Sequence, residues 1–196
     1  NSYYYANMKN EGTMPEILEG DFDILKKGKT DALSISYYMS TISHYGEESL
    51  TNVKDVVIKK NPYLEMSEFG WTVDPIGLRI TLRQLYDRYE MPIYIVENGF
   101  GYDDQMKNDI IEDDYRIDYM RKHLEEMKLA IKEGVDCRGY LMWGPIDILS
   151  SRAQMKKRYG YVYVDLDDLG QGSGKRYKKK SFYWYKTVIE SNGGVL

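Results

Sequence analysis

The sequence contains a single cysteine, Cys137, among its 196 residues, so no internal disulfide bond can form. Together with a charged surface of ordinary composition, this scarcity favours a reducing, cytoplasmic setting. The sequence also lacks a basic excess, because 27 Lys and Arg residues stand against 31 Asp and Glu residues, for a net charge of -4. Such a chain has no surplus of positive charge to neutralise phosphates, and this argues against nucleic acid as a partner.

Long apolar runs and leader segments are missing as well. No run approaches the roughly 20 residues that a membrane-spanning helix needs, so we expect no membrane association. The chain opens on Asn1-Ser2 without an initiator methionine or a signal-peptide pattern. We therefore expect a chain that starts within a longer protein.

What is present suits a folded domain. Hydrophobic residues make up 42% of the sequence and charged residues 30%, which is enough to bury a core and excludes disorder. Only 4 Phe residues are found beside 20 Tyr residues. An apolar ring with a hydroxyl suits surfaces such as sugar sites, although this bias alone assigns no function.

Short strand-like runs alternate with helical patterns along the chain. The alternation predicts parallel βα units, and the continuously apolar run at 92–96 is typical of a strand buried on both faces. The predicted strands are 31–38, 92–96 and 138–143, and the predicted helices are 15–27, 75–89, 114–133 and one capped by Ser181. Three strands are few for an α/β domain, whereas a closed eight-stranded barrel takes about 250 residues. We expect residues 1–196 to be one part of a larger barrel.

Chemically useful side chains stand where the predicted strands end. Glu97 closes the second strand, Tyr38 the first and Trp143 the third. Ligands of parallel α/β folds lie at the carboxyl ends of the strands, so these three groups share one rim. A carboxylate, a phenol and an indole there suit glycoside hydrolysis by a carboxylate nucleophile. The alternative is that Glu97 only caps the next element or pairs with a lysine.

The segment 95–99 (Ile-Val-Glu-Asn-Gly) resembles the nucleophile signature of glycoside hydrolase family 1, and the chain as a whole most resembles the bacterial 6-phospho-β-glucosidases. Further resembling segments follow the family's order at 36–40, 69–79, 143–147, 157–165 and 179–186. The resemblance implies a partial (β/α)8 TIM barrel, with residues 1–196 forming its C-terminal portion from about the sixth strand to the last helix.

The resemblance also implies roles for single residues. Glu97 would be the nucleophile, Tyr38 would hydrogen-bond to it, and Trp143 would stack beneath the sugar. A packed tyrosine at the barrel rim remains the alternative for Tyr38. Trp71 could line the side of the leaving group or pack in the barrel wall, and we favour the wall.

A phosphorylated substrate is implied by the loop after Trp143. Plain β-glucosidases of the family carry Glu-Trp where this chain carries Ser150-Ser151, and that glutamate would repel a sugar phosphate. Ser150, Lys157 and Tyr159 then resemble a phosphate clamp of hydroxyl, ammonium and phenol, with Ser151 as the less favoured serine. The small side chain of Ser151 favours the gluco over the galacto series. The alternative is a solvated charge run at 156–158.

Other polar clusters point to no further chemistry. His44 and His123 lack ligand partners at useful spacing, and His123 is expected to face solvent, so we expect no metal. The basic segment 175–180 is expected to be a solvated face, and 170–174 a surface hairpin rather than a nucleotide loop. We expect no cofactor.

One required group was not found. A retaining glycosidase needs a second carboxylate as acid/base, which the family carries in a Thr-x-Asn-Glu pattern that this chain lacks. We therefore expect a phosphorylated β-glucoside as substrate of the complete protein and no activity of the chain alone. The alternatives are a non-catalytic half-barrel that pairs with a second copy or with the N-terminal half, or a β-glucosidase or 6-phospho-β-galactosidase of the same family.

Overall fold

The computed structural model describes residues 2–44, 57–59 and 61–196, and it forms two units, 1–31 and 32–196. The first unit holds helices α1 (Ser2–Glu11) and α2 (Asp21–Lys27). The prediction of a helix over 15–27 was wrong for its first half. Gly20 adopts a left-handed conformation with φ of 93° and marks the start of α2. The sequence analysis did not predict α1.

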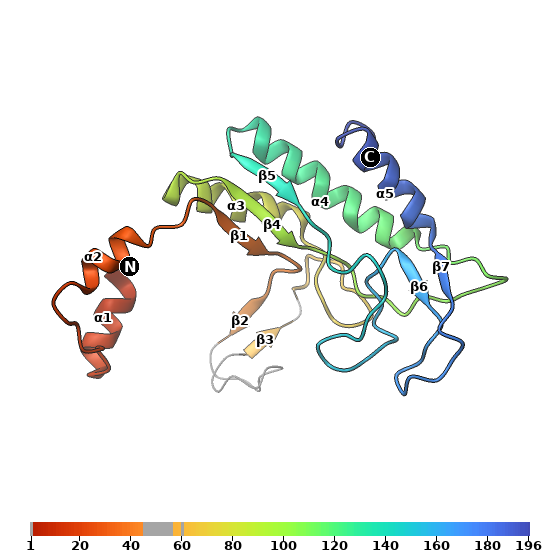
Figure 1. The fold of residues 1–196 in the computed structure, drawn as a ribbon, viewed down its shortest axis with the longest axis horizontal. Coiled ribbons are helices and arrows are strands. Elements are labelled where there is room, and N and C mark those ends of the chain that lie inside the picture. The colour runs from red at the N-terminus through yellow and green to blue at the C-terminus, as the bar shows by residue number, and fades with distance from the viewer. Residues whose placement is uncertain (1, 45–56, 60) are drawn as a thin grey trace. The chain divides into compact units, whose positions relative to one another are not determined.

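The second unit is built on a parallel sheet, as predicted. Its strands β1 (Leu33–Ser36), β4 (Ile93–Glu97) and β5 (Cys137–Tyr140) lie in the order β1-β4-β5 (Figure 1). Within the described part of the chain, β1 and β5 each pair along one edge only.

Three helices accompany this sheet. Helices α3 (Pro75–Tyr89) and α4 (Asp114–Lys132) pack against each other, and α5 (Lys180–Glu190) packs beside α4 (Figure 1). The predicted start of α3 is confirmed, because the Asp74 side chain accepts a hydrogen bond from the Gly77 N–H at 2.9 Å. The predicted cap of α5 was wrong: Lys179 stands at the N-cap, and Ser181 lies inside the helix.

The core lies between the sheet and the helices, where Leu78 and Ile95 are fully buried. The apolar stripes of α3 and α4 leave the core at their last members, because Tyr89 and Ile131 are each 43% exposed, whereas Ala130 is fully buried. A stripe with steps of 3 and 4 drifts around a helix of 3.6 residues per turn, so the neighbouring position faces the core at its end.

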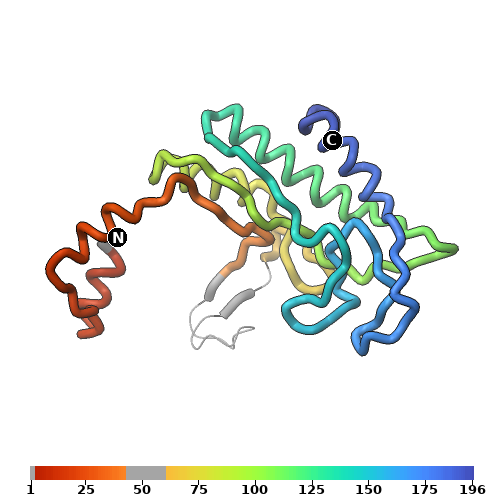
Figure 2. Tube along the Cα trace, viewed as in Figure 1, coloured from red at the N-terminus to blue at the C-terminus, as the bar shows by residue number. Residues whose placement is uncertain are grey.

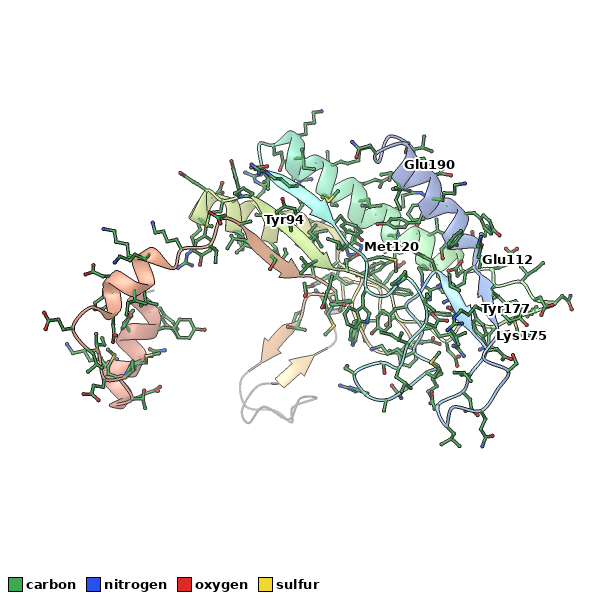
Figure 3. The ribbon with its side chains drawn as sticks, in the orientation of Figure 1. Tyr94, Glu112, Met120, Lys175, Tyr177 and Glu190 are labelled. Carbon is green, nitrogen blue, oxygen red and sulfur yellow. The ribbon has the colours of Figure 1, made fainter. Side chains whose placement is uncertain are left out.

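The second face of the sheet is open within the described part of the chain. Val96 is 38% exposed, so the prediction of burial on both faces was wrong for the second strand. On this sheet Gly139 faces Tyr94, which Figure 3 labels on β4. A Cβ at Gly139 would lie 2.7 Å from Tyr94 Cδ1, so the close approach of this ring requires glycine.

Two antiparallel hairpins complete the unit: β2 (Ile42–His44) with β3 (Val57–Lys59), and β6 (Val162–Val164) with β7 (Arg176–Lys178). The predicted hairpin segment 170–174 lies in the turn between β6 and β7. Figure 2 follows the chain from β5 through a long loop to β6. No helix in the described ranges is long and apolar enough to cross a membrane.

Candidate active site

Glu97 and Tyr38 meet at the carboxyl ends of β4 and β1. The Tyr38 hydroxyl donates a hydrogen bond to Glu97 Oε2 at 3.1 Å, across 59 positions of sequence. Burial, and then the neighbouring Glu97 carboxylate, raise the pKa of Tyr38 far above its usual value. The phenol therefore stays protonated and acts as a donor to the carboxylate.

Two further rings surround this pair. The Trp71 ring lies 5.3 Å from the Tyr38 ring and 6.1 Å from the Tyr159 ring, between centroids. Tyr159 in turn lies 6.4 Å from Tyr38. The Trp71 indole therefore packs against residues around Glu97. The choice between the barrel wall and the side of the leaving group stays a prediction.

Lys157 joins the same cluster. It is 6% exposed, and its Nζ lies 3.6 Å from the centre of the Trp71 ring. Burial, and then the charge of Arg152, lower the pKa of Lys157 to about 8. The alternative of a solvated charge run is wrong for Lys157 and for Arg158, which is 5% exposed.

The segment after Glu97 is glycine-rich because these side chains pack against it. A Cβ at Gly101 would lie 2.8 Å from both Lys157 Cε and Tyr159 Cζ. A Cβ at Gly99 would lie 3.4 Å from Trp143 Cβ and from Tyr159 Cδ1. Trp143, Lys157 and Tyr159 therefore all approach the backbone that follows the candidate nucleophile.

The two serines are placed differently. Ser150 is buried, and its Oγ accepts the backbone N–H groups of Arg152 at 3.4 Å and Gln154 at 3.2 Å, within its own loop. Ser151 is exposed. The described part of the chain shows no hydrogen bond from either serine to Lys157. Of the expected clamp, Lys157 and Tyr159 contact the Trp71 ring, which lies against Tyr38.

Asp147 joins the two ends of the loop at 147–160. Its Oδ1 accepts the Gly160 N–H at 2.9 Å and also the Lys179 ammonium at 2.8 Å. A Cβ at Gly160 would lie 2.5 Å from the Asp147 backbone nitrogen, so the two ends of the loop touch. The segment that carries Ser150, Lys157 and Tyr159 thus begins and ends at one anchored point.

Asp147 belongs to a buried network of three carboxylates and three cations. Lys179 bonds Asp104 as well as Asp147, and Arg116 bonds Asp104 at 2.8 Å. The six members, each 5% exposed or less, are Asp104, Asp113, Arg116, Asp147, Arg158 and Lys179. Balanced charge lets the group stay ionised in the interior. The expected solvated face at 175–180 was therefore wrong for Lys179.

The two linked carboxylates of the network have opposite pKa shifts. Burial raises the pKa of Asp104, but Arg116 and Lys179 together hold it below its usual value. The pKa of Asp147 is raised, because burial and the neighbouring Asp104 charge outweigh the effect of Lys179. Asp147 is therefore the more weakly held carboxylate of the two.

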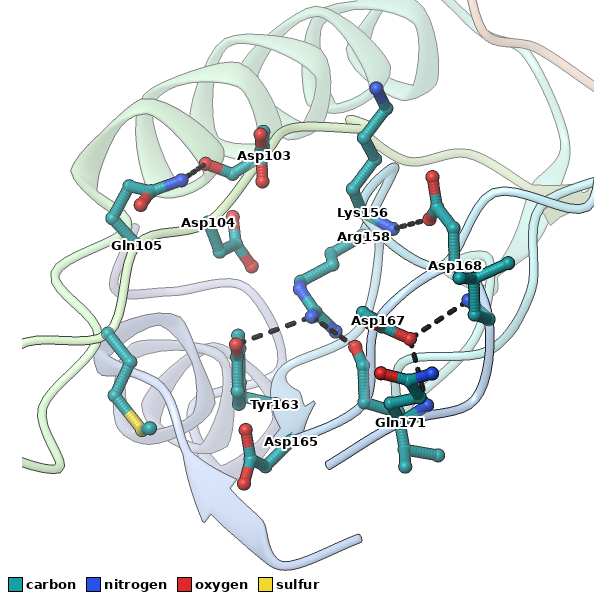
Figure 4. Close-up of a pocket in the computed structure, with 13 residues that line it drawn as sticks. Asp103, Asp104, Gln105, Lys156, Arg158, Tyr163, Asp165, Asp167, Asp168 and Gln171 are labelled. Atoms are coloured by element: carbon teal, nitrogen blue, oxygen red, sulfur yellow. Dashed lines mark hydrogen bonds between the residues drawn. The ribbon is translucent and has the colours of Figure 1, made fainter. Parts of the chain in front are cut away.

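A separate cavity of about 540 Å³ lies beside the network (Figure 4). Neither Glu97, Tyr38 nor Lys157 lines it. Its aspartates bind backbone groups of their own loops: Asp168 accepts the Lys156 N–H at 2.8 Å, and Asp167 accepts the Gln171 N–H at 2.8 Å. With five aspartates in its wall, this cavity does not suit an anionic sugar.

His123 was expected to face solvent, and this was wrong. It is fully buried, with Nδ1 2.7 Å from the Tyr119 carbonyl oxygen. Burial lowers the pKa of His123 to about 4, so the ring is neutral near pH 7. The side chain of His44 lies outside the described part. Among the described residues, no group of three or more His, Cys, Asp or Glu side chains could hold a metal ion.

The site combines the Glu97 carboxylate at a strand end with the Tyr38 hydroxyl that donates to it. Aromatic rings and the Lys157 ammonium lie around this pair. The sequence model of glycosyl hydrolase family 1 matches residues 1–194. The chain belongs to glycosyl hydrolase family 1.

Individual relatives of the family agree with this match. The aryl-phospho-β-D-glucosidase BglH of Bacillus subtilis is 52% identical over 185 residues, covering 92% of this chain and 39% of its own length. The 6-phospho-β-glucosidase AscB of Escherichia coli is 48% identical, covering 100% of this chain and 42% of its own length. The 6-phospho-β-galactosidase of Leptotrichia buccalis is 37% identical, covering 90% and 41%. The chain thus spans about two fifths of these relatives.

The solved structures agree on the fold. The family 1 β-glucosidase from Thermotoga maritima superposes with a TM-score of 0.79 at 30% identity, covering 93% of this chain and 40% of that one. The predicted fold class, a partial (β/α)8 barrel, is confirmed. The identity of the chain as a family 1 glycosidase segment related to the 6-phospho-β-glucosidases is confirmed as well.

Proposed function

We propose that this chain is the C-terminal portion of a retaining 6-phospho-β-glucosidase, from about the sixth barrel strand to the last helix. The observation that carries the proposal is the pairing of Glu97 with the Tyr38 hydroxyl at 3.1 Å, beside a cluster that holds the Lys157 ammonium. The relatives named as phospho-β-glucosidases, at 48% and 52% identity, support the substrate class.

In this reaction the Glu97 carboxylate attacks the anomeric carbon and the bond to the leaving oxygen breaks. A glycosyl ester forms on Glu97, and water then hydrolyses it with retention of configuration. The Tyr38 hydroxyl holds the carboxylate in place. The proton for the leaving oxygen comes from a second carboxylate, supplied by a segment outside this chain.

The sugar lies over Trp143, whose indole gives an apolar floor beside the segment that follows Glu97. Its 6-phosphate binds to Lys157 and Tyr159, with Ser150 and Ser151 on the same loop. Lys157 supplies the charge, and the hydroxyls supply oriented donors. Ser150 Oγ accepts two backbone N–H groups of its own turn, and its O–H proton would be donated to the phosphate.

The substrate is a phosphorylated sugar of the cell interior, so we propose a cytoplasmic protein without cofactor or metal. A non-catalytic half-barrel that pairs with a partner is the second candidate. It is favoured by one observation: an open apolar groove of about 640 Å³ runs between the end of β5 and α5, lined by Met142, Ile146, Phe182, Tyr185 and Ile189 among others.

The test is hydrolysis by the complete protein of three 4-nitrophenyl β-glycosides: 6-phosphoglucoside, 6-phosphogalactoside and unphosphorylated glucoside. The proposal expects kcat/KM to be highest for the 6-phosphoglucoside by at least about tenfold. A preference for the unphosphorylated glucoside would make the protein a β-glucosidase of the same family, and a preference for the galacto substrate a 6-phospho-β-galactosidase. No hydrolysis of any of them would favour the non-catalytic alternative.

A further inference from the structure

We propose that Asn98 is a positioning residue, whose buried side-chain amide fixes the backbone that carries Glu97 and Tyr38. The inference rests on the proposed function, because it concerns the placement of the proposed nucleophile. It assigns to Asn98 a task other than the turn that an Asn-Gly pair usually forms.

The side-chain amide of Asn98 forms hydrogen bonds with residues from three elements. Asn98 is fully buried. Its Nδ2 donates to the Tyr37 carbonyl oxygen at 2.5 Å and to the Tyr119 hydroxyl at 3.2 Å. Its Oδ1 accepts from the Tyr140 hydroxyl at 2.5 Å. The end of β1, helix α4 and strand β5 are therefore joined through one side chain.

A register shift between β1 and β4 explains why the backbone at Glu97 requires these side-chain hydrogen bonds. In the register of β1 and β4, Ile35 pairs with Ile95, but Ser36 pairs with Glu97, so Val96 is skipped. Regular alternation would place Glu97 on the face of Ile95, which packs in the core against the helices. The one-residue shift lets Glu97 meet Tyr38 instead, and such bulges leave a ladder locally unpaired.

The Asn98 amide occupies the place of a missing ladder bond. Beyond the shift, the Tyr37 N–H still donates to the Glu97 carbonyl oxygen at 2.9 Å. In a regular parallel ladder the Tyr37 carbonyl oxygen would next accept a backbone N–H from the position of Gly99. It accepts the Asn98 side chain instead. Backbone bonds also hold this turn, because the Trp143 N–H donates to the Asn98 carbonyl oxygen at 2.7 Å, and the Asn98 side chain adds the bond that the ladder lacks.

Tyr119 links the Asn98 side chain to the backbone of Tyr38, the residue that donates to Glu97. Its hydroxyl accepts from Asn98 and donates to the Tyr38 carbonyl oxygen at 2.8 Å. Tyr119 is 2% exposed and packs against His123, with 4.0 Å between ring centroids and 32° between the ring planes. Both residues of the Glu97–Tyr38 pair therefore have their backbones fixed by the same two side chains.

The test compares Asn98→Ala and Tyr119→Phe in the complete protein. The matched control is Tyr161→Phe, since Tyr161 is equally buried at 4% and its hydroxyl has no hydrogen-bond partner among the described residues. We expect Asn98→Ala to lower kcat at least about 30-fold, because small misplacements of reacting groups cost up to about 100-fold. We expect Tyr119→Phe to lower kcat about tenfold. KM should change less than about threefold in both variants, because Lys157 and Tyr159 lie on another loop.

Hydrogen exchange separates this inference from the proposed function. The Tyr37 N–H donates to the Glu97 carbonyl oxygen, and the Trp143 N–H donates to the Asn98 carbonyl oxygen. We expect both N–H groups to exchange at least about tenfold faster in Asn98→Ala than in the control. If the parent protein hydrolyses no glycoside but exchange is accelerated in Asn98→Ala, the result supports the positioning role of Asn98 and contradicts the proposed function. An Asn98→Ala protein with kcat within twofold of the parent and unchanged exchange overturns the inference. If Asn98→Ala does not fold, Tyr119→Phe decides by the same two readouts.

Discussion

The Lys157 ammonium lies 3.6 Å from the centre of the Trp71 indole ring, in contact with its face. Phe69 and Tyr159 are the next rings, at 5.2 and 5.7 Å from Nζ. An ammonium held by aromatic faces keeps its charge without a carboxylate partner, and it can be offered to an incoming anion. A carboxylate in the same place would satisfy Lys157 and would repel a phosphate.

Replacing Lys157 by Ala in the complete protein should weaken the use of 6-phosphoglucoside by about 2–3 kcal/mol, the cost of losing a charge-assisted contact. The measurement is kcat/KM on phosphorylated and unphosphorylated 4-nitrophenyl glucosides. Lys156→Ala is the control, because Lys156 is the exposed neighbour and its side chain makes no ion pair among the described residues. Equal losses on both substrates would mean that Lys157 is structural.

Removing Lys179 should destabilise the fold. Lys179→Ala leaves Asp104 and Asp147 buried with less positive charge, and breaking a buried ion pair costs about 3–5 kcal/mol. Lys180→Ala is the control, since Lys180 bonds Glu112 and Asp114 at the exposed surface, and its loss should change stability much less. Urea unfolding of both variants measures the difference. Similar unfolding midpoints would contradict a structural role for the buried network.

His123 should make stability depend on pH. Its pKa is about 4 in the folded protein, below its usual value of 6.5, so the unfolded chain binds the proton more readily between these values. Stability should therefore fall as the pH drops from 6.5 to 4, by about 3 kcal/mol from this group. The free energy of unfolding of His123→Phe, measured across that range, should depend less steeply on pH. A slope equal to that of the parent would show that His123 is not the group responsible.

The chain of residues 1–196, prepared alone, should hydrolyse neither phosphorylated nor plain glucoside. Its sequence lacks the Thr-x-Asn-Glu pattern expected to carry the acid/base, and general acid catalysis is worth about 10²–10⁴ in rate. Within the described part, β1 and β5 have open edges that favour pairing with another chain. Sedimentation should show self-association, and a monomer that turns over 6-phosphoglucoside would refute both expectations.

The strand ends could be predicted from sequence because each strand is recognised from the residues of its own segment. Each strand is a short apolar run, and the carboxyl ends of parallel strands share one edge, so Glu97 and Tyr38 were expected to meet and do. From sequence, the pair Asn98-Gly99 indicates only a turn. The partners of Asn98 on α4 and β5 are 21 and 42 positions away, and no local pattern indicates them.

Buried charge could not be predicted for the same reason. A run of basic residues at 175–180 has the composition of a solvated face, and burial of Lys179 depends on Asp104, 75 positions earlier. His123 likewise has charged neighbours in sequence, but in the structure its imidazole packs against the rings of Tyr37 and Tyr119. Helical periodicity locates a face, but polar residues on that face are assigned only when their partners are known.

The most direct measurement is the hydrolysis of 4-nitrophenyl 6-phospho-β-D-glucoside by the complete protein and its Glu97→Gln variant. Glutamine keeps the shape of the side chain and the contact with Tyr38, but it removes the charge that attacks the anomeric carbon. We predict that kcat falls by at least about 10³-fold while the unfolding midpoint stays within a few degrees of the parent. A Glu97→Gln protein with kcat within tenfold of the parent would contradict the assignment of Glu97 as the nucleophile.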